Sequence, residues 1–374
     1  MAEALRLPHL LRQGVAQHVA PAIAFGIATA DGQRGTWFAG HHGPDRSGRA
    51  CDALSRFDLA SLTKPLSTTA WCMRLVDAGR LALDQPIGDH LPVDDAALAG
   101  CPLWRLLSHT TGLPAHRRYY EGLGPTVLRT GRFAQAERAL RRMLAATPTE
   151  VAPGRREIYS DLGFLLLAWI CERADAPFAS IWRTLPGHDA PERGLHFRPL
   201  PAPGDDRDLY VPTERCPWRG RLLQGEVHDD NAWTLGGVAG HAGLFGTLDA
   251  TLDTALRWLR ALQGDDAALG LPAEAVTTWC DRRWMHPHGT RVLGWDTPTP
   301  GASTSGAHFG RRSIGHLGFT GTSLWIDPAA GVAMVLLTNR VCPSRDSAGI
   351  RAYRPALHDA GWAWLRARSP ERFT

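Results

Sequence analysis

The chain contains one lysine, Lys64, which stands three residues after Ser61 in the segment LASLTKPLST (59–68). Lysine and arginine together number 41, so the other 40 basic residues are arginine. A guanidinium stays protonated in proteins, whereas burial or neighbouring charges can lower the pKa of a lysine ammonium. We therefore expect Lys64 to take part in proton transfer. Ser61 is the nearby group that would need it, because a free serine hydroxyl is a poor nucleophile.

A spacing of three residues places Ser61 and Lys64 on one face of a helix, within reach of each other. At a helix start, free backbone N–H groups and the positive end of the dipole also favour developing negative charge. Such a site offers a nucleophile, a proton acceptor and half of an oxyanion hole. The pair needs supporting context, because with 14 serines in 374 residues a lone lysine follows one at this spacing by chance in about 4% of cases.

The elements around this pair can be read from local patterns. Residues 61–78 have helical periodicity, and Gly79 occupies the position of a C-terminal cap glycine. Pro65 fits such a helix only if the helix begins very near Ser61, because proline is tolerated in the first turn and not later. Upstream, residues 22–40 predict two strands joined around Asp31 and Gly32, a strong hairpin signal.

The C-terminal part regains strand character. Residues 315–328 and 331–339 predict a hairpin that closes near Gly331, and residues 350–368 predict a final helix, as residues 3–18 predict a first one. The section between, about 80–300, mixes helical segments with loops rich in proline and glycine. Strands at both ends with helices between them predict an α/β sheet closed by the two termini around a helical insertion.

Composition narrows the classes of partner. A net charge of +4 without a basic block argues against binding to nucleic acid or an anionic membrane. No run reaches the roughly 18 apolar residues of a membrane helix, and no basic-then-apolar leader is seen, so a cytoplasmic protein is expected. Seven widely spaced cysteines without a Cys-x-x-Cys pair predict reduced thiols rather than a disulfide framework or a zinc site.

Six segments carry a resemblance to a known family. SLTK (61–64) resembles the Ser-x-x-Lys motif of the serine β-lactamase and penicillin-binding-protein superfamily. The other five resemble successive segments of its class C β-lactamase-related serine hydrolase branch, which is similar to family VIII esterases. They are LLSHTTGLP (106–114), the strip around Tyr159 and Asp161, residues 240–259, GHLGFTG (315–321) and VAMVLLTN (332–339). Together they run in family order over about residues 20–340, nearly the whole chain.

The resemblance implies a β-lactamase/transpeptidase-like α/β fold. Its central antiparallel sheet would be built from N- and C-terminal segments, with flanking helices and a large, mainly helical insertion. The whole chain, 1–374, would be a single domain. Its α/β subdomain would comprise about 1–60 plus 305–374, and its helical subdomain about 61–304.

Carried over residue by residue, the resemblance also implies a mechanism. Ser61 would attack a carbonyl and become acylated, while Lys64 and Tyr159 would share the proton work. A protonated lysine beside a tyrosine lowers the pKa of the phenol, so either group remains open as the general base. The backbone N–H groups of Ser61 and Phe319 would form the oxyanion hole, and Gly318 would let substrate approach the strand closely.

One departure from the family pattern is Asp161, which stands where the better-known enzymes carry asparagine. A carboxylate cannot donate a hydrogen bond to a substrate carbonyl, so that contact would be lost. Asp161 can instead pair with Lys64 and hold it protonated, which favours Tyr159 as the base. It could equally be a purely structural anchor for the Lys64 ammonium, and both roles remain open.

A second departure is His316-Leu317-Gly318, which stands in place of Lys-Thr-Gly. Family enzymes that act on β-lactams and cell-wall peptides use that lysine and threonine to hold a substrate carboxylate. Leu317 has no hydroxyl, and His316 is expected to be only partly charged near neutral pH. This motif therefore favours an uncharged acyl substrate, an ester or a secondary amide. His316 would either bind substrate or brace the Tyr159 hydroxyl.

A cluster of polar residues in 225–243 could suggest a metal site: His228, Asp229, Asp230 and His241. The cluster lacks the His-x-x-x-His spacing of a helix-bound zinc site, and a glycine-rich turn behind an active site explains it as well. We therefore expect neither a metal nor a cofactor. Asn231 and His241 could border the substrate cleft.

Three hypotheses for function follow. The leading one is a serine hydrolase of the esterase or amidase type that acts on a small-molecule ester or amide through an acyl-enzyme. A second is a β-lactamase or a D-amino-acid carboxypeptidase or transpeptidase, which Leu317 and His316 make harder to explain. A third is a non-catalytic ligand receptor or scaffold on the same fold, against which the joint presence of Ser61, Lys64 and Tyr159 argues.

Overall fold

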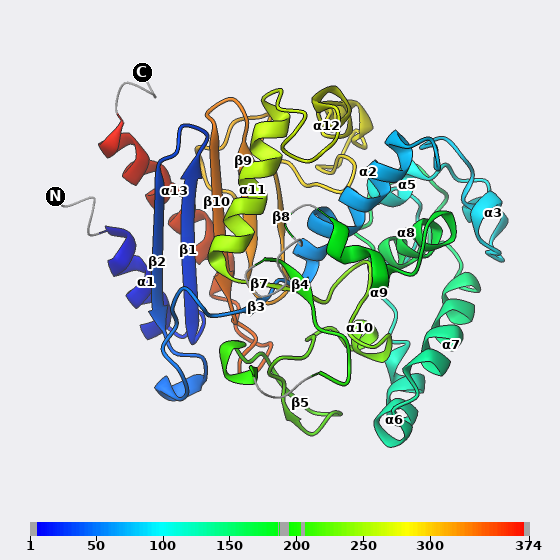
Figure 1. The fold of residues 1–374 in the computed structure, drawn as a ribbon, viewed down its shortest axis with the longest axis horizontal. Helices are drawn as coiled ribbons and strands as arrows, with labels where there is room; N and C mark the ends of the chain where they lie inside the picture. Colours follow the sequence, from blue (N-terminus) through cyan, green and yellow to red (C-terminus); the bar gives the residue numbers. More distant parts are fainter. Residues whose placement is uncertain (1–5, 186, 188–193, 203–205, 370–374) are drawn as a thin grey trace.

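The main sheet joins the two ends of the chain. The computed structural model describes residues 6–185, 187, 194–202 and 206–369. N-terminal β1 pairs with C-terminal β10, with Ile23 opposite Thr338, and a sheet built from both termini is therefore confirmed (Figure 1). The five antiparallel strands follow the spatial order β2 (Arg34–Gly40), β1 (Ala22–Thr29), β10 (Val332–Thr338), β9 (Ser323–Asp327) and β8 (Ile314–Leu317).

Helices bury both faces of this sheet. α1 (Arg6–Ala16) and α13 (Ile350–Arg368) pack together against one face, while α11 (Leu248–Leu262) packs against the other. The alternation along β1 matches this arrangement: Phe25 and its alternate neighbours lie in the cluster under α1 and α13, whereas smaller alanines face α11. A Cβ on Gly26 would lie 3.1 Å from Leu252 of α11, so the glycine lets that helix approach closely.

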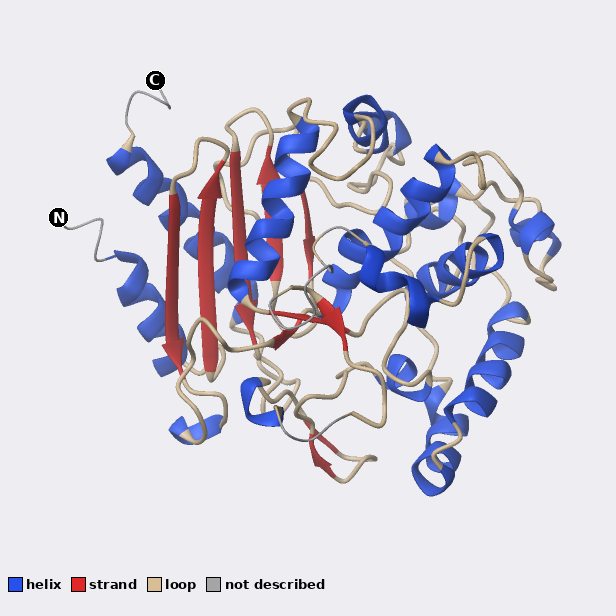
Figure 2. Cartoon of the chain, viewed as in Figure 1, coloured by secondary structure: helices blue, strands red, loops and turns tan. Residues whose placement is uncertain are grey.

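The remaining helices gather beside the β8 edge of the sheet (Figure 2). These helices are α2 (Ala70–Asp77), α3 (Ile87–His90), α4 (Ala96–Ala99), α5 (Trp104–Leu107), α6 (Tyr120–Thr130), α7 (Phe133–Ala145), α8 (Asp161–Ala174), α9 (Phe178–Ile181), α10 (Asp230–Thr234) and α12 (Ala273–Trp279). Two small antiparallel sheets accompany them: β3 (Phe57–Asp58), β7 (Leu244–Gly246) and β4 (His196–Phe197) form one, and β5 (Arg215–Cys216) and β6 (Arg221–Leu222) the other.

The segment that follows Ser61 is helical, as predicted, but only its last part is an α-helix. A 3-10 turn, η3 (Ala60–Leu62), leads into a π-helix, η4 (Lys64–Thr69), and then into α2. Pro65 lies in the first turn of η4, where its missing N–H is tolerated. Gly79 has a φ of +67° and ends the helix, as expected of a cap glycine. π-Helical turns are rare and often accompany functional sites.

Both hairpins predicted from the sequence form in the structure. The first hairpin turns through Gly32, which has a φ of +93°. The second turns at Gly331, but residues 315–328 form two strands, β8 and β9, rather than one, because Gly318–Thr322 make a tight turn between them. The final helix is confirmed as α13. The predicted first helix is confirmed over Arg6–Ala16, and its residues 3–5 lie outside the described residues.

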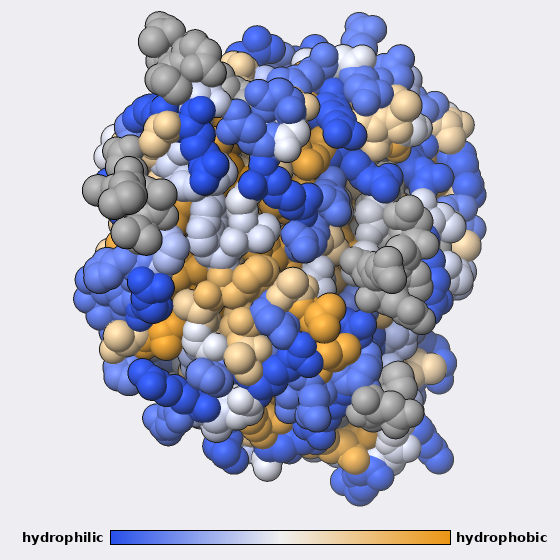
Figure 3. Space-filling view, turned by 60° about the vertical axis from the view of Figure 1, so that its left-hand side comes forward, coloured by the Kyte–Doolittle hydropathy of each residue, from blue (hydrophilic) through white to orange (hydrophobic). Residues whose placement is uncertain are grey.

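One face of the molecule is mainly hydrophilic, with apolar residues gathered near its middle (Figure 3). Within the described ranges, none of the helices combines the length and the apolar character needed to cross a membrane. All seven cysteines are free thiols.

Candidate active site

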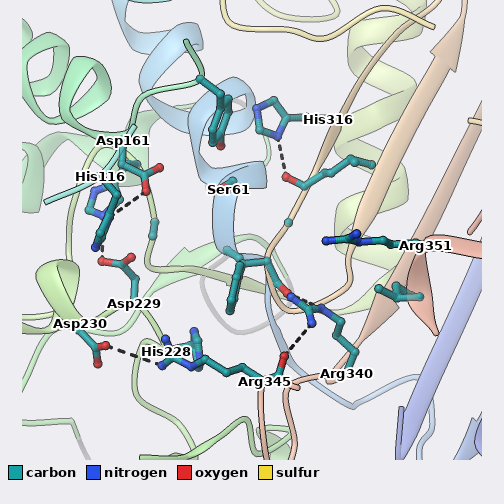
Figure 4. Close-up of a pocket in the computed structure, with 18 of the residues that line it drawn as sticks. Ser61, His116, Asp161, His228, Asp229, Asp230, His316, Arg340, Arg345 and Arg351 are labelled. Atoms are coloured by element: carbon teal, nitrogen blue, oxygen red, sulfur yellow. Dashed lines mark hydrogen bonds and ion pairs between the residues drawn. The ribbon is translucent and has the colours of Figure 1, made fainter. Parts of the chain in front are cut away.

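A cavity of about 820 Å³ brings the predicted site residues together. It opens where the start of the Ser61 helix, the end of β8, the start of α8 and the chain around His241 meet. Lys64 lies beneath Ser61 and is fully buried. Figure 4 shows Ser61 between Asp161 on one side and a group of arginines on the other. The predicted residues that line the cavity are Ser61, Tyr159, Asp161, His316, Leu317, Gly318 and Phe319.

The turn that presents Ser61 is held in an unusual conformation. Ala60, directly before it, has a φ of +48°, a region that residues with a side chain rarely adopt. The buried Asp58 holds this turn, because its Oδ1 accepts the Ala60 N–H at 2.8 Å and its Oδ2 accepts the His228 N–H at 2.7 Å. Sequence reasoning missed Asp58; the only available signal was an acidic residue three positions before the serine.

Lys64 makes three hydrogen bonds from its ammonium group. Nζ donates to Ser61 Oγ at 3.1 Å, to Asp161 Oδ1 at 2.7 Å and to the carbonyl of His241 at 3.1 Å. An ammonium has three donors, so all of them are used. Burial alone would lower the pKa of Lys64, but the charge of Asp161 and the hydrogen bond to it more than offset this effect and raise the pKa above its usual value. Lys64 is therefore protonated in the resting state.

Asp161 is the anionic partner in this group. Burial would raise its pKa, but Lys64, a hydrogen bond from His116 and the nearby His241 lower it well below its usual range. The His116 ring nitrogen Nδ1 lies 3.3 Å from Asp161 Oδ2, and this bond with Asp161 raises the pKa of His116. Asp161 thus supplies a fixed negative charge, which holds the proton on Lys64.

Tyr159 lies between two cations. Its ring centroid is 4.8 Å from Lys64 Nζ and 4.9 Å from Arg291 Cζ. The phenol oxygen is buried without a hydrogen-bond partner among the described residues. Burial raises the pKa of Tyr159, and the neighbouring Lys64 and Ser61 only partly offset this, so the resting group is a neutral phenol. A buried hydroxyl without a partner is costly, which points to a role in reaction rather than in stability.

His109, in the segment 106–114, holds the tyrosine strip in place. Its Nδ1 accepts the Ser160 N–H at 3.0 Å, and its ring lies 4.6 Å from the Tyr159 ring, centroid to centroid. Burial, together with the charges of Arg291 and Lys64, lowers the pKa of His109 well below its usual value, so this ring is neutral. The resemblance of residues 106–114 to a family segment drew attention to this stretch, but it did not indicate that His109 positions the chain around Tyr159.

His316 is also neutral in the structure. Burial, the charge of Lys64 and that of Arg291 lower its pKa to about 3, so the expected partial charge near neutral pH is absent. Its Nδ1 lies 2.8 Å from the carbonyl oxygen of Leu317. The His316 and Tyr159 rings are 5.8 Å apart, and no hydrogen bond joins His316 to the Tyr159 hydroxyl. The structure therefore does not support a bracing role for His316.

The turn after β8 has a donor available for an oxyanion. The backbone N–H of Phe319 has no hydrogen-bond acceptor among the described residues, and neither has that of Ser61. The carbonyls of this turn are fixed from behind: Arg354 donates to Gly318 at 3.0 Å, and Arg340 donates to Phe319 at 2.8 Å. This geometry fits an oxyanion hole, which needs donors that are already oriented.

The reason for glycine at position 318 differs from the expected one. A Cβ there would lie 2.0 Å from Thr322 Oγ1 and 2.7 Å from the carbonyl oxygen of Leu59. Glycine is therefore required by the packing of the turn against the chain before Ser61, and the close approach of substrate to Gly318, which lines the cavity, stays a prediction. The effect on catalysis is indirect, since the same packing sets the position of the Phe319 N–H.

The polar cluster in 225–243 forms separate pairs. His241 Nε2 lies 2.8 Å from Asp229 Oδ1, His228 Nε2 lies 2.9 Å from Glu214 Oε2, and Asp230 pairs with Arg219. Among the described residues no group of three or more His, Cys, Asp or Glu side chains could hold a metal ion. His241 lines the cavity, whereas the buried Asn231 bonds to the backbone around α6 instead.

Comparison with known proteins agrees with this geometry. The family model described as Beta-lactamase matches residues 7–358. This chain belongs to the beta-lactamase family. It is 30% identical, over 315 residues, to a putative D-alanyl-D-alanine carboxypeptidase of Salmonella paratyphi B, a match that covers 76% of this chain and 69% of the relative. A relative from Salmonella newport has the same name and the same figures.

Solved structures share the β-lactamase/transpeptidase-like fold. The crystal structure of SurE has a TM-score of 0.65 and 25% identity, over 96% of this chain and 76% of SurE. EstCE1, a hydrolase with promiscuous acyltransferase activity, has a TM-score of 0.71 and 19% identity, over 96% and 98%. Simvastatin synthase from Aspergillus terreus has a TM-score of 0.69 and 19% identity, over 98% and 100%. Members of the beta-lactamase family are serine hydrolases, so hydrolase activity is supported for this chain.

Proposed function

We propose that this chain is a serine hydrolase that forms a covalent acyl-enzyme on Ser61 and cleaves an ester or an amide. The observation that carries the proposal is the contact between Lys64 and Ser61. The chain's single lysine donates to Ser61 Oγ at 3.1 Å beneath an open cavity, and the unpartnered Tyr159 phenol lies beside it. Family membership supports the same reaction class.

In the proposed acylation, Ser61 Oγ attacks the substrate carbonyl, and its proton passes to the fraction of Tyr159 that has already lost its own proton to solvent, since the resting group is a neutral phenol. Lys64 is unsuited to accept it at rest, because all three of its donors are engaged and Asp161 holds it protonated. Its charge instead favours the phenolate. The oxyanion of the tetrahedral intermediate is stabilised by the N–H groups of Ser61 and Phe319. The proton then moves to the leaving group, and water later hydrolyses the acyl-serine bond.

The segment His316-Leu317-Gly318 guides the choice of proposed substrate. Leu317 has no hydrogen-bonding side chain, and His316, with a pKa of about 3, carries no charge at neutral pH. Neither can hold a carboxylate in the manner of a lysine or threonine. We therefore propose an uncharged acyl substrate, an ester or a secondary amide, for this site.

The direct test is to trap the acyl-enzyme during turnover. The protein is mixed with 4-nitrophenyl butyrate, quenched with acid and analysed by intact mass and by peptide mapping. The proposal predicts a mass increase equal to the butyryl group on the peptide that contains Ser61, and no hydrolysis above background by Ser61→Ala. Hydrolysis that persists in Ser61→Ala would refute it.

One comparison favours a second candidate, a D-amino-acid carboxypeptidase. The named Salmonella relatives are 30% identical and are called putative D-alanyl-D-alanine carboxypeptidases. The discriminating measurement is release of D-alanine from an N-acylated D-alanyl-D-alanine dipeptide. Release at a kcat/KM above that for the butyrate ester would favour the peptidase, and the reverse would favour the esterase-type activity.

A further inference from the structure

A second cavity, of about 690 Å³, lies apart from Ser61. It opens where the ends of α11 and α12 meet the turn between β9 and β10 and the chain just before β8. Figure 1 shows α12 beside the upper end of α11. Ser313, which precedes β8, lines this cavity, whereas Leu317, at the other end of that strand, lines the Ser61 cavity. None of the described residues lines both, so the second cavity is not part of the candidate active site.

The charged side chains of this second cavity are mainly basic. Arg282, Arg311 and Arg312 line it, and Asp281 is the one acidic side chain among its described lining residues. The lining therefore carries a net charge of +2. Asp281 Oδ1 accepts the N–H of Arg283 at 2.7 Å and so caps the short helical turn that follows. In the described part of the chain, no ion pair joins Asp281 to the three arginines.

The three arginines differ in how firmly they are held. Arg311 and Arg312 are exposed, and their guanidinium groups make no hydrogen bond or ion pair with any described residue. Arg282 donates to the carbonyl of Arg311 at 3.0 Å and to Thr297 Oγ1 at 3.4 Å, which orients its guanidinium group. Burial and the repulsion from Arg311 both lower the pKa of Arg282. A bound anion would offset this repulsion.

Two walls of the cavity are joined through Asp327, which ends β9. Its Oδ2 accepts the N–H of Gly310 at 2.7 Å, and its Oδ1 accepts those of Ala329 and Ala330 at 3.0 Å each. The segment before β8 and the turn between β9 and β10 are thus held by one buried carboxylate. The cavity is already formed in the free protein, and such preorganisation lowers the cost of binding.

Hydroxyl and apolar groups complete the lining. The exposed Thr277 makes no side-chain hydrogen bond with a described residue. The Ser313 hydroxyl is buried and also lacks a partner among the described residues. Burying a hydroxyl without a partner is unfavourable, and an oxyanion would supply an acceptor. Leu262, Pro328 and Ala329 add apolar surface to the same cavity.

We propose that this cavity binds a phosphate group through Arg282, Arg311 and Arg312, at a site separate from the reaction at Ser61. A phosphate dianion matches the net charge of the lining, and guanidinium groups bind its oxygens through paired hydrogen bonds. The ligand class is a phosphate monoester of a small organic molecule, because a cavity of 690 Å³ has room for such a molecule and the apolar lining would contact its organic part. Inorganic phosphate shares the recognised chemistry, and the test separates the two sources.

The test measures the binding of phenyl phosphate and of inorganic phosphate by isothermal titration calorimetry at constant ionic strength. At pH 8 the phosphate is a dianion, because its second pKa is about 6. We expect saturable binding, with a lower Kd for phenyl phosphate; a lower Kd for inorganic phosphate would contradict the monoester assignment. Arg311→Gln and Arg312→Gln should each raise the Kd about tenfold. Both side chains are exposed, so these variants should fold, and their melting temperatures check this.

The matched control is Arg351→Gln. Arg351 is also an exposed arginine without a described partner, but it lines the Ser61 cavity, and its removal lowers the net charge equally. We expect the Kd to stay within about twofold of the parent value in this variant. An increase equal to that in Arg311→Gln would mean a general charge effect or binding beside Ser61, and either would overturn the proposal.

Absence of saturable binding at millimolar concentrations, or a Kd unchanged in both Arg311→Gln and Arg312→Gln, would likewise overturn it. Phenyl phosphate should not compete with 4-nitrophenyl butyrate, and competitive inhibition would place the phosphate in the Ser61 cavity instead. Phosphate binding should survive in Ser61→Ala. The proposal is therefore independent of the proposed hydrolysis, and the two can fail separately.

Discussion

The wall of the cavity around Lys64 and the wall around Arg340 treat charge in different ways. On the first, Lys64 pairs with Asp161, and Asp229 pairs with His241. On the second, Arg340 and Arg351 face the same cavity with no carboxylate partner among the described residues. Paired charges fix protonation states within the protein. Unpaired ones leave net positive charge on that side of the cavity.

The largest effect is expected from replacing Lys64, the paired cation beside Ser61. Lys64→Arg keeps the positive charge, but the larger, planar guanidinium does not fit the fully buried site and cannot keep the ammonium's contacts with Ser61 and Asp161. We predict a loss of about 10³-fold in kcat/KM for a neutral ester. Melting temperature checks the fold of the variant, and Lys64→Met provides a comparison without charge. Activity within a few-fold of the parent would show that positive charge alone suffices at this position and exclude a specific role for the Lys64 ammonium in the mechanism.

The second prediction concerns the polar group near Lys64 that lacks a partner. Tyr159→Phe removes a buried hydroxyl with no hydrogen bond to a described residue, so the free energy of unfolding should stay the same or rise, by up to about 1 kcal/mol. Acylation should slow by about 10²-fold, because the proposed base is lost.

Tyr119→Phe is the matched control for this change. The buried Tyr119 hydroxyl bonds to Thr147 at 2.6 Å, away from the cavity, so its loss should destabilise the fold by about 1 kcal/mol without affecting acylation. Burst kinetics with a 4-nitrophenyl ester and urea unfolding measure both quantities. A nearly unchanged acylation rate in Tyr159→Phe would remove the tyrosine from the mechanism.

The third prediction concerns the ion pair between Lys64 and Asp161. Asp161→Asn leaves the fully buried Lys64 without its anion, and we expect a destabilisation of about 3 kcal/mol at pH 7. The pKa of Asp161 is lowered by folding, so its contribution is complete above the unfolded value of about 4 and is lost as the pH falls through the lower, folded value. The difference from the parent in urea unfolding should therefore shrink at pH 3.

The same variant should shift the pH dependence of acylation. Asp161 raises the pKa of Tyr159, so its neutralisation should lower that pKa and move the alkaline rise in acylation to lower pH. His116→Gln, which removes only the more exposed partner of Asp161, should change both measurements less. An identical pH profile in Asp161→Asn and the parent would contradict the electrostatic coupling.

The smallest effects are expected from substitutions of Gly318 and Phe319, which are neighbours in the turn after β8. Phe319 has a half-exposed side chain, and Phe319→Ala keeps its backbone N–H, so only a few-fold change in kcat/KM is expected. Gly318→Ala places a Cβ against Thr322 and the Leu59 carbonyl, displacing the proposed donor, and should cost about tenfold. If Phe319→Ala were the more damaging change, the side chain and not the backbone would be the functional part.

Much of the fold, and the pair Ser61 and Lys64 in the candidate site, could be predicted from sequence because the signals are local. Ser61 and Lys64 are three residues apart, Asp31 and Gly32 mark a tight turn, and Gly79 ends a helix. Each depends on neighbouring residues, and motif order supplied the long-range arrangement. The three-residue spacing held even though the first turns are 3-10 and π rather than α.

The sequence could not predict which arginines line the cavity or which of them lack a partner, because both depend on contacts between residues far apart in the chain. The chain has 40 arginines, and nothing in the sequence distinguishes Arg351, which has no described partner, from Arg345, which binds Glu214, 131 residues away. The state of His316 was misjudged for a related reason. Its pKa is set by burial and by Lys64 and Arg291, none of which is adjacent in sequence.

The most direct test of the central claim, an activated Ser61, needs no knowledge of the substrate. The protein is exposed to a fluorophosphonate, its intact mass is measured, and the labelled peptide is mapped, with Ser61→Ala as the control. The account predicts a single adduct, on Ser61, which is absent from the variant. An adduct on another residue, or none on the folded parent protein, would contradict the account and favour a non-catalytic ligand receptor on this fold.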